Sequence, residues 1–212
     1  MATIVVVGGT GYTGGNVVRE AASRGHDVVS VSRSEPEDPV AGVRYEVGSV
    51  SDVADRVVQG ADVVVAALSP RGDMVGRLVE VYGELARLAA QAGARYLQVG
   101  GFSSLRPAPG QPRVVEGEIP EQYRAEALEG EATRVLLAEH APEGLDWLFI
   151  SPAGGYGAFA PGARTGSYRV GGEIALFDAD GGSNISGADF ALAILDEIES
   201  PRHHREHIGI AY

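Results

Sequence analysis

The chain has 212 residues, enough for an α/β domain with a substantial core, and no run approaches the ~18 apolar residues that a membrane span needs. It contains no cysteine, which excludes disulfides and thiolate chemistry, and its formal net charge of -12 argues against nucleic acid or an anionic membrane as a partner. We therefore expect a cytoplasmic protein in which residues 1–212 form a single domain.

The first predicted element is a β-branched strand, Thr3–Val7, that runs directly into glycines spaced G-x-x-G-x-x-G. Gly8 tolerates the unusual backbone angle of a turn, Gly11 lets the backbone approach a pyrophosphate, and Gly14 lets the next helix pack tightly on the strand. That helix, predicted over residues 11–24, offers free N–H groups and a positive dipole end to phosphates. The motif predicts a dinucleotide site, and a glycine-rich turn without a ligand is the alternative.

Short apolar runs then alternate with longer amphipathic ones. Further strands are predicted at Asp27–Val31, Val43–Val47, Asp62–Ala66, Arg95–Val99 and Asp146–Ile150, and further helices at residues 51–58, 73–92 and 121–140. The valine-rich strands do not alternate in polarity, which is typical of a parallel sheet covered on both faces. The predicted fold class is α/β, a Rossmann-like doubly wound parallel sheet with the glycine turn on a central strand.

The last third of the chain changes character, because residues 152–172 are rich in glycine, proline and aromatic residues. Glu173–Phe177 is predicted to be a strand, residues 186–198 an amphipathic helix, and Ile208–Ala211 an edge strand. We expect this part to complete a small substrate pocket. Arg106–Pro120 holds four prolines and shows no periodicity, so it is predicted to be a loop, either a surface excursion or an active-site lid.

The residue that follows the second strand indicates which dinucleotide to expect. Arg33 stands where an NAD site usually has a carboxylate for the ribose hydroxyls. A guanidinium binds a 2′-phosphate bidentately, so Arg33 predicts NADP(H), with an ordinary surface arginine as the alternative. Ser32 and Ser34 can add hydroxyl donors. Glu35 and Asp38 fall in the following loop and are poorly placed to replace the carboxylate.

Small and polar residues follow the other strands at the sheet edge where ligands of such folds lie. They leave room for the riboses and the nicotinamide. The predicted cofactor-binding residues are Gly8, Thr10, Gly11, Tyr12, Thr13, Gly14, Ser32, Arg33, Ser49, Val50, Ala67, Leu68, Ser69, Gly100, Gly101 and Pro152.

These motifs resemble the atypical branch of the short-chain dehydrogenase/reductase superfamily. The glycine turn and Arg33 are similar to those of NADPH-dependent flavin reductases and biliverdin reductase B. Residues 99–105, 151–153, 161–169 and 184–191 resemble a bacterial group described as NAD(P)H-flavin reductases. The resemblance covers essentially the whole chain. It implies an NADP(H)-dependent oxidoreductase with a small-molecule acceptor, flavin as a substrate, and a monomeric or homodimeric state.

Two departures from the family pattern bear on the chemistry. The main branch uses Tyr-x-x-x-Lys as its acid, whereas Tyr123 here has Ala127 at the lysine position and the chain contains no lysine. The biliverdin and flavin reductases have a pocket histidine where this chain has Ala153. Ser103 matches the pocket serine after the fifth strand and is the predicted catalytic residue.

The missing acid favours hydride transfer to a planar aromatic acceptor, free flavin or a quinone, because such transfer needs positioning more than a residue of tuned pKa. Phe102, Tyr156, Phe159 and Tyr168 are candidates for a stacking wall, and ordinary packing is the alternative for each. Two other functions stay open: an NADP-binding redox sensor without turnover, and an isomerase or epimerase, which would normally need the tyrosine–lysine pair.

Three polar clusters carry weaker signals. His203 and His207 lie one helical turn apart without an H-E-x-x-H pattern, so no metal site is predicted. Residues 178–182 hold only a fragment of a calcium loop and are predicted to form a turn. Arg164 and Arg169 are expected to pair with carboxylates, with a substrate or cofactor phosphate as the alternative partner.

Overall fold

A computed structural model describes residues 1–212 and contains a single eight-stranded sheet. The strands are β1 (Thr3–Val7), β2 (Asp27–Ser32), β3 (Arg44–Val47), β4 (Val63–Ala66), β5 (Arg95–Val99), β6 (Trp147–Pro152), β7 (Arg169–Gly171) and β8 (Glu206–Ala211). The helices are α1 (Tyr12–Ser23), α2 (Val50–Val58), α3 (Leu78–Ala92), α4 (Glu121–His140) and α5 (Gly187–Glu199). Short 3-10 helices η1 (Gly72–Met74), η2 (Phe102–Ser104) and η3 (Val114–Glu116) lie in the connections. The predicted Rossmann-like α/β fold is confirmed.

The strand order places the glycine turn in the interior of the sheet. The order is β3-β2-β1-β4-β5-β6-β8-β7, and every pairing is parallel except that of β7 with β8. The chain builds outward from β1 to β3 and then returns to add β4 on the other side of β1. In such sheets the ligand crevice opens at this reversal, above the carboxyl ends of the strands.

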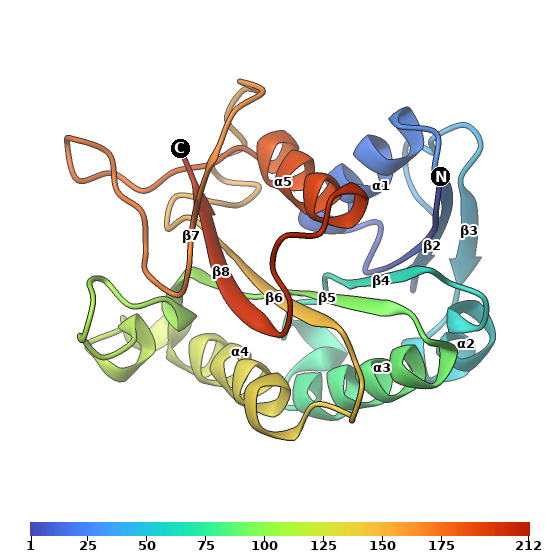
Figure 1. Cartoon of the computed structure of the whole chain (residues 1–212), viewed down its shortest axis with the longest axis horizontal. Coiled ribbons are helices and arrows are strands. Elements are labelled where there is room, and N and C mark those ends of the chain that lie inside the picture. The colour runs from blue at the N-terminus through green and yellow to red at the C-terminus, as the bar shows by residue number, and fades with distance from the viewer.

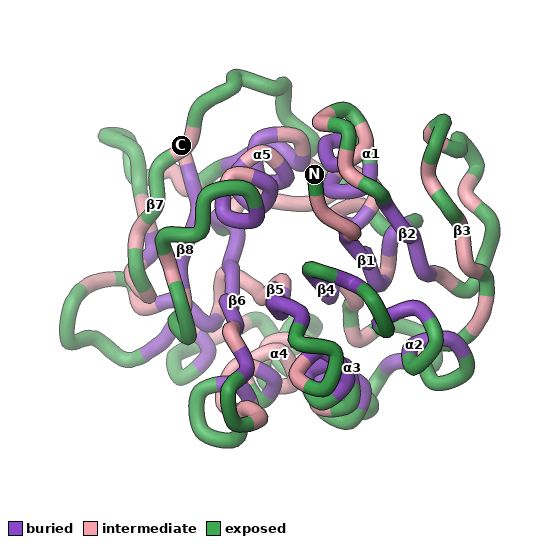
Figure 2. Tube along the Cα trace, turned by 45° about the vertical axis from the view of Figure 1, so that its right-hand side comes forward, coloured by how far each residue is buried: buried purple, intermediate pink, exposed green.

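The helices form a layer on each face of the sheet (Figure 1), with α1 and α5 on one side and α2, α3 and α4 on the other. Ile4 and Val6 of β1 pack in the core on the α1–α5 side, while Val5 and Val7 pack in the core on the opposite side. Burial on both faces explains the unbroken valine runs. Figure 2 shows the central strands buried beneath exposed connections. None of the helices is long and apolar enough to cross a membrane.

Both strand predictions for the C-terminal part need correction. Residues 173–177 are not a strand; they form one isolated bridge, between Ile174 and Arg106, and the strand of this region is β7. The predicted edge strand at residues 208–211 is the end of β8, which lies between β6 and β7. The buried strand β6 needs a partner on its outer side, and the end of the chain supplies it.

The helix predicted over residues 73–92 begins later, at Leu78. Gly72 and Gly76 adopt left-handed backbone angles with φ of 61° and 75°, and residues 72–74 form the 3-10 turn η1. The positive angles stop an α-helix from forming before residue 78.

The proline-rich loop at residues 106–120 is held against the domain. Arg113 is only 7% exposed, and its guanidinium donates to the carbonyl of Ser104 at 2.6 Å and pairs with Glu173. Val115 is buried as well. These anchors favour a fixed wall over a mobile lid.

One buried carboxylate ties together the C-terminal segments that lie beside the glycine turn. Asp189, in the first turn of α5, accepts hydrogen bonds from the N–H groups of Thr165 and Gly166 at 2.7 and 2.9 Å and from the hydroxyls of Ser186 and Tyr212 at 3.0 and 2.5 Å. Burial alone would raise the pKa of Asp189, but these donors outweigh it and lower the pKa to about 2.

We predict that Asp189→Asn destabilises the fold at neutral pH by about 1–3 kcal/mol, because several donors lose their charged acceptor. A carboxyl whose folded pKa lies below its unfolded value stabilises the fold above about pH 4 and loses that contribution as pH falls towards the folded pKa. The gap in unfolding free energy between the variant and the parent, measured by urea denaturation, should therefore shrink on acidification. Asp180→Asn, at an exposed carboxylate without a side-chain partner, is the control. A gap independent of pH would contradict the assignment.

Candidate functional site

The turn between β1 and α1 is built from backbone in close contact. Gly8 has a φ of 89°, and a Cβ at this position would lie 2.5 Å from the carbonyl oxygen of Ala67. A Cβ at Gly14 would collide with the carbonyl of Gly8. Glycine is therefore required at both positions, and α1 begins directly on top of the turn.

The first turn of α1 presents unsatisfied donors to the crevice. Gly11, the N-cap residue, has extended backbone angles and no side chain that could cap the helix. The N–H groups of Tyr12, Thr13 and Gly14 donate to no group of the protein. A Cβ at Gly11 would meet a single neighbour, the Gly8 carbonyl oxygen at 3.2 Å, so the space above it is open. Three free donors at the positive end of a helix dipole fit a pyrophosphate.

The ends of β2 and β4 flank this turn on either side. Arg33 follows β2, is 62% exposed, and forms an ion pair with Asp73 of η1, which is 57% exposed. Ser32 donates to the carbonyl of Ser34 at 2.9 Å. On the other side the backbone of Leu68 exchanges two hydrogen bonds of 2.9 Å with the Tyr82 hydroxyl, which fixes this loop on α3.

The far half of the crevice lies above β5 and β6. A Cβ at Gly100 would collide with the ring of Phe149, so this position too requires glycine. Ser103, in η2, is half-buried, and its hydroxyl has no hydrogen-bond partner within the protein. It is therefore free to bond a ligand. Pro152 ends β6 and is buried.

All predicted cofactor-binding residues, together with Ser103, lie at the carboxyl ends of β1 to β6 or in the segments that follow them. Ser49 and Val50, for example, begin α2 after β3, and the Ser49 hydroxyl lies 2.6 Å from Asp52. The fold thus gathers residues from six separate parts of the sequence along one edge of the sheet. Their contacts with a cofactor stay predictions.

A cavity of about 750 Å³ lies beside the turn, between α1, residues 34–40 and the start of α5. Of the predicted residues, only Thr10, Gly11 and Tyr12 line it. Glu35, Glu37 and Asp38 line it as well, together with Arg19 on α1, so this side of the turn is rich in carboxylates.

Tyr12 contributes its backbone to the crevice and its side chain to the packing of the C-terminal region. Its hydroxyl accepts a hydrogen bond from the N–H of Gly187 at 3.1 Å and donates to the carbonyl of Pro161 at 3.3 Å. Its ring meets the ring of Tyr156 edge-on, with centroids 5.3 Å apart. The side chain thereby holds the start of α5 against the glycine turn.

Three of the four aromatic candidates for a stacking wall are engaged elsewhere or exposed. Tyr156 hydrogen-bonds Thr13 at 2.8 Å and packs on Phe190, and burial raises its pKa. Tyr168 donates to Asp196 at 2.6 Å. Phe159 is 83% exposed.

The fourth candidate, Phe102, lies beside Ser103 and meets the ring of Phe177 at 6.4 Å and 88°. The sequence did not indicate Phe177 as a candidate for this wall, because residues 173–177 were predicted to form a strand.

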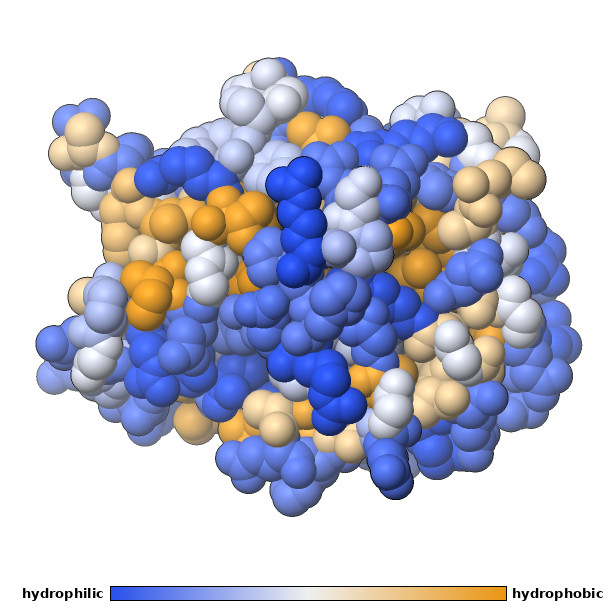
Figure 3. Space-filling model, in the orientation of Figure 1, coloured by the Kyte–Doolittle hydropathy of each residue, from blue (hydrophilic) through white to orange (hydrophobic).

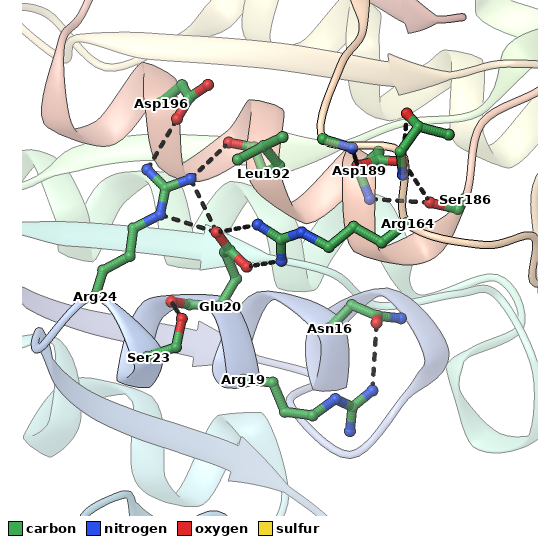
Figure 4. A network of polar contacts seen from close by, with 12 residues as sticks. Asn16, Arg19, Glu20, Ser23, Arg24, Arg164, Ser186, Asp189, Leu192 and Asp196 are labelled. Atoms are coloured by element: carbon green, nitrogen blue, oxygen red, sulfur yellow. Dashed lines mark hydrogen bonds and ion pairs between the residues drawn. The ribbon is translucent and has the colours of Figure 1, made fainter.

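The two arginines of the C-terminal loop behave differently. Arg164 and Arg24 converge on the carboxylate of Glu20 (Figure 4), with Arg164 contacting it at 2.5 Å and Arg24 at 3.0 Å. The hydrogen bond from Arg164 is the largest cause of the lowered pKa of Glu20. The pairing expected for Arg164 is confirmed. Arg169 pairs with no Asp or Glu side chain; it donates to the main-chain oxygens of Phe177 and of Tyr212, the last residue of the chain.

The C-terminal histidines point to three different partners. His203 contacts Glu197 at 2.7 Å, His204 contacts Asp146 at 3.0 Å, and His207 bonds the Ser151 hydroxyl at 2.9 Å. Burial, assisted by the charge of Arg113, lowers the pKa of His207 to about 3. Asp178 closes a turn by accepting from the N–H groups of Asp180 and Gly182.

Comparison with known proteins agrees with this geometry. The protein family described as NAD(P)H-binding matches residues 8–201. Protein YwnB of Bacillus subtilis, itself uncharacterized, is 31% identical over 212 residues, which cover 98% of this chain and 97% of that protein.

Two crystal structures extend the comparison. One, of a proposed epimerase from Bacteroides thetaiotaomicron, is 33% identical with a TM-score of 0.88, covering 100% of this chain and 97% of that one. The other, of a proposed NADH-flavin reductase from Streptococcus pneumoniae, is 27% identical with a TM-score of 0.85, covering 100% and 99%.

We predict that Gly11→Val abolishes NAD(P)H binding in a protein that still folds. The φ of Gly11 is −72°, which valine tolerates, and the contact with Gly8 needs only a small shift. The branched side chain would fill the space above the free N–H groups. NADPH fluorescence titration with circular dichroism measures both effects. Gly15→Val, one turn further along α1, where a Cβ makes only ordinary contacts, should bind as the parent does. An unchanged titration of Gly11→Val would place the pyrophosphate elsewhere.

Proposed function

The chain belongs to the NAD(P)H-binding family, and we propose that it is an NADPH-dependent oxidoreductase that reduces a planar aromatic acceptor such as free flavin or a quinone. One observation carries the proposal: free first-turn N–H groups of α1 and an unbonded Ser103 hydroxyl lie along the same edge of the sheet. The likeness to a proposed NADH-flavin reductase supports it.

Around the glycine turn, N–H groups and Arg33 would attract a phosphate, whereas nearby carboxylates would repel one. The N–H groups of Tyr12, Thr13 and Gly14 would hold the pyrophosphate, and Arg33 would meet a 2′-phosphate at the end of β2. The carboxylates of Glu35, Glu37 and Asp38 line the neighbouring cavity and would disfavour a phosphate there. When bound, a reduced nicotinamide supplies a hydride to the acceptor.

The far half of the crevice offers a hydrogen-bond donor without an activating partner. The Ser103 hydroxyl contacts no basic side chain, and Tyr123 on α4 is 58% exposed without a hydrogen-bond partner. His207 is uncharged at neutral pH and already bonds Ser151. Such a site suits an acceptor whose reduced form takes its proton from solvent, as flavins and quinones do, better than a carbonyl that needs a proton donor aimed at its oxygen.

An apolar wall beside Ser103 supports a planar acceptor. A Cβ at Gly154 would lie 3.5 Å from three ring carbons of Phe102, so the glycine leaves this ring uncovered, and Phe177 closes one side. Arg113 binds both the turn that carries Phe102, through the Ser104 carbonyl, and the segment that leads to Phe177, through Glu173. Figure 3 shows apolar side chains gathered over the C-terminal loops beside β7.

We predict that the purified protein oxidises NADPH faster than NADH in the presence of riboflavin, FMN, FAD or a quinone, and does not reduce aliphatic aldehydes. Tyr123→Phe should leave turnover nearly intact, and Ser103→Ala should cost the equivalent of one hydrogen bond, about 0.5–1.5 kcal/mol. The loss of NADPH absorbance measures the rate for each acceptor and each variant. Loss of activity in Tyr123→Phe, or reduction of aldehydes alone, would identify an acid-assisted carbonyl reductase. NADPH binding without any turnover would identify a redox sensor.

We also predict that Phe177→Ala raises the KM for flavin while kcat changes little, because the substitution removes ring contacts worth about 0.5–1.5 kcal/mol, a KM increase of roughly two- to tenfold. Phe159→Ala is the matched control, since Phe159 is 83% exposed and lies outside the Phe102–Phe177 pair. Equal KM values for the two variants would remove Phe177 from the acceptor site.

A further inference from the structure

An ion pair crosses the crevice at the point where the strand order reverses. Arg33 follows β2 and Asp73 lies in η1 after β4, while β1 and its glycine turn run between those two strands. The guanidinium and the carboxylate therefore meet over the half of the crevice where the adenosine of a dinucleotide binds. Both side chains are more than half exposed, so an arriving ligand can reach either one.

The Asp73 side of this bridge is the fixed side. The turn that carries Asp73 lies between the left-handed residues Gly72 and Gly76 and is anchored by Met74, which is buried. Beyond it, the N–H groups of Gly76 and Leu78 donate to the Glu129 carboxylate on α4 at 3.0 and 2.8 Å. Opening the bridge therefore means moving the long side chain of Arg33.

Several carboxylates lie near Arg33 in the chain or in space, and the one that its guanidinium contacts is that of Asp73. The acids that follow Arg33 in the chain, Glu35, Glu37 and Asp38, line the cavity beside α1. They come from the same connection as Arg33, whereas Asp73 approaches it from across β1.

We propose that Asp73 is a specificity-determining residue that competes with the 2′-phosphate of NADPH for the guanidinium of Arg33. The inference rests on the proposed binding of NADPH. A 2′-phosphate carries nearly two negative charges. Whether it takes the place of Asp73 on Nη1 or binds the other N–H groups of Arg33 beside it, the Asp73 carboxylate then faces a like charge. NADH lacks this phosphate and leaves the bridge intact. Asp73 therefore weakens the binding of NADPH but not that of NADH, which reduces the preference for NADPH.

The test uses two probes that differ only by the 2′-phosphate, adenosine 2′,5′-bisphosphate and 5′-AMP, titrated calorimetrically into the parent and into Asp73→Asn. The variant should bind the bisphosphate about two- to fivefold more tightly, the range expected when an exposed ion pair is released. Binding of 5′-AMP should not change. Both residues are exposed, so the variant should unfold at the same temperature as the parent.

Glu84→Gln is the matched control. It makes the same change in charge and breaks an ion pair with Arg87, 2.6 Å long and with both side chains about half exposed, in the middle of α3. It should alter neither affinity. A general effect of net charge would instead appear equally in both variants and would overturn the proposal.

Other outcomes separate the two proposals. If the parent prefers the bisphosphate and Asp73→Asn binds it equally or more weakly, Asp73 does not compete, although the NADPH assignment stands. A gain shared by 5′-AMP would likewise overturn the competition. If neither protein distinguishes the two probes, the assignment of Arg33 to a 2′-phosphate fails, and the competition fails with it.

Discussion

The close contact between the β1 turn and the first turn of α1 is the constraint on which the rest of the site depends. Gly8 lies against the Ala67 carbonyl and Gly14 against the Gly8 carbonyl, at distances that admit no Cβ. The N-cap residue of the helix, Gly11, has no side chain that could cap it, so the first N–H groups of α1 remain available to a ligand. Gly8 and Gly14 thus fix the geometry of the turn, and Gly11 leaves the N–H groups above it open to a phosphate.

The C-terminal part of the chain encloses this site through polar contacts more than through regular structure. Asp189 accepts from five donors in three segments. Tyr12 bonds both the Pro161 carbonyl and the start of α5, and Arg164 reaches back to Glu20 on α1. At the far half of the crevice Arg113 does the same for the segments that carry Phe102 and Phe177. The region with the least periodic sequence is thereby held in one arrangement over the crevice.

Local pattern was sufficient to predict β1 to β6, the five helices and the sheet edge where the candidate residues gather, because each depends on periodicity or on glycine spacing within a short window. It was insufficient where partners lie far apart in the chain. Residues 173–177 have the composition of a strand, but Glu173 is engaged by arginines and β8 pairs with residues 169–171 instead. The Arg33–Asp73 ion pair joins residues 40 positions apart, so the local sequence around neither residue predicts it.

The central claim is that a dinucleotide binds with its pyrophosphate on the first turn of α1. Amide NMR of the isotopically labelled protein during titration with NADP tests it directly, because a phosphate that accepts from an N–H group shifts that resonance and slows its exchange with solvent. The account predicts the largest changes at Tyr12, Thr13 and Gly14. Changes concentrated instead in residues 34–40 and at the start of α5, around the neighbouring cavity, would contradict it.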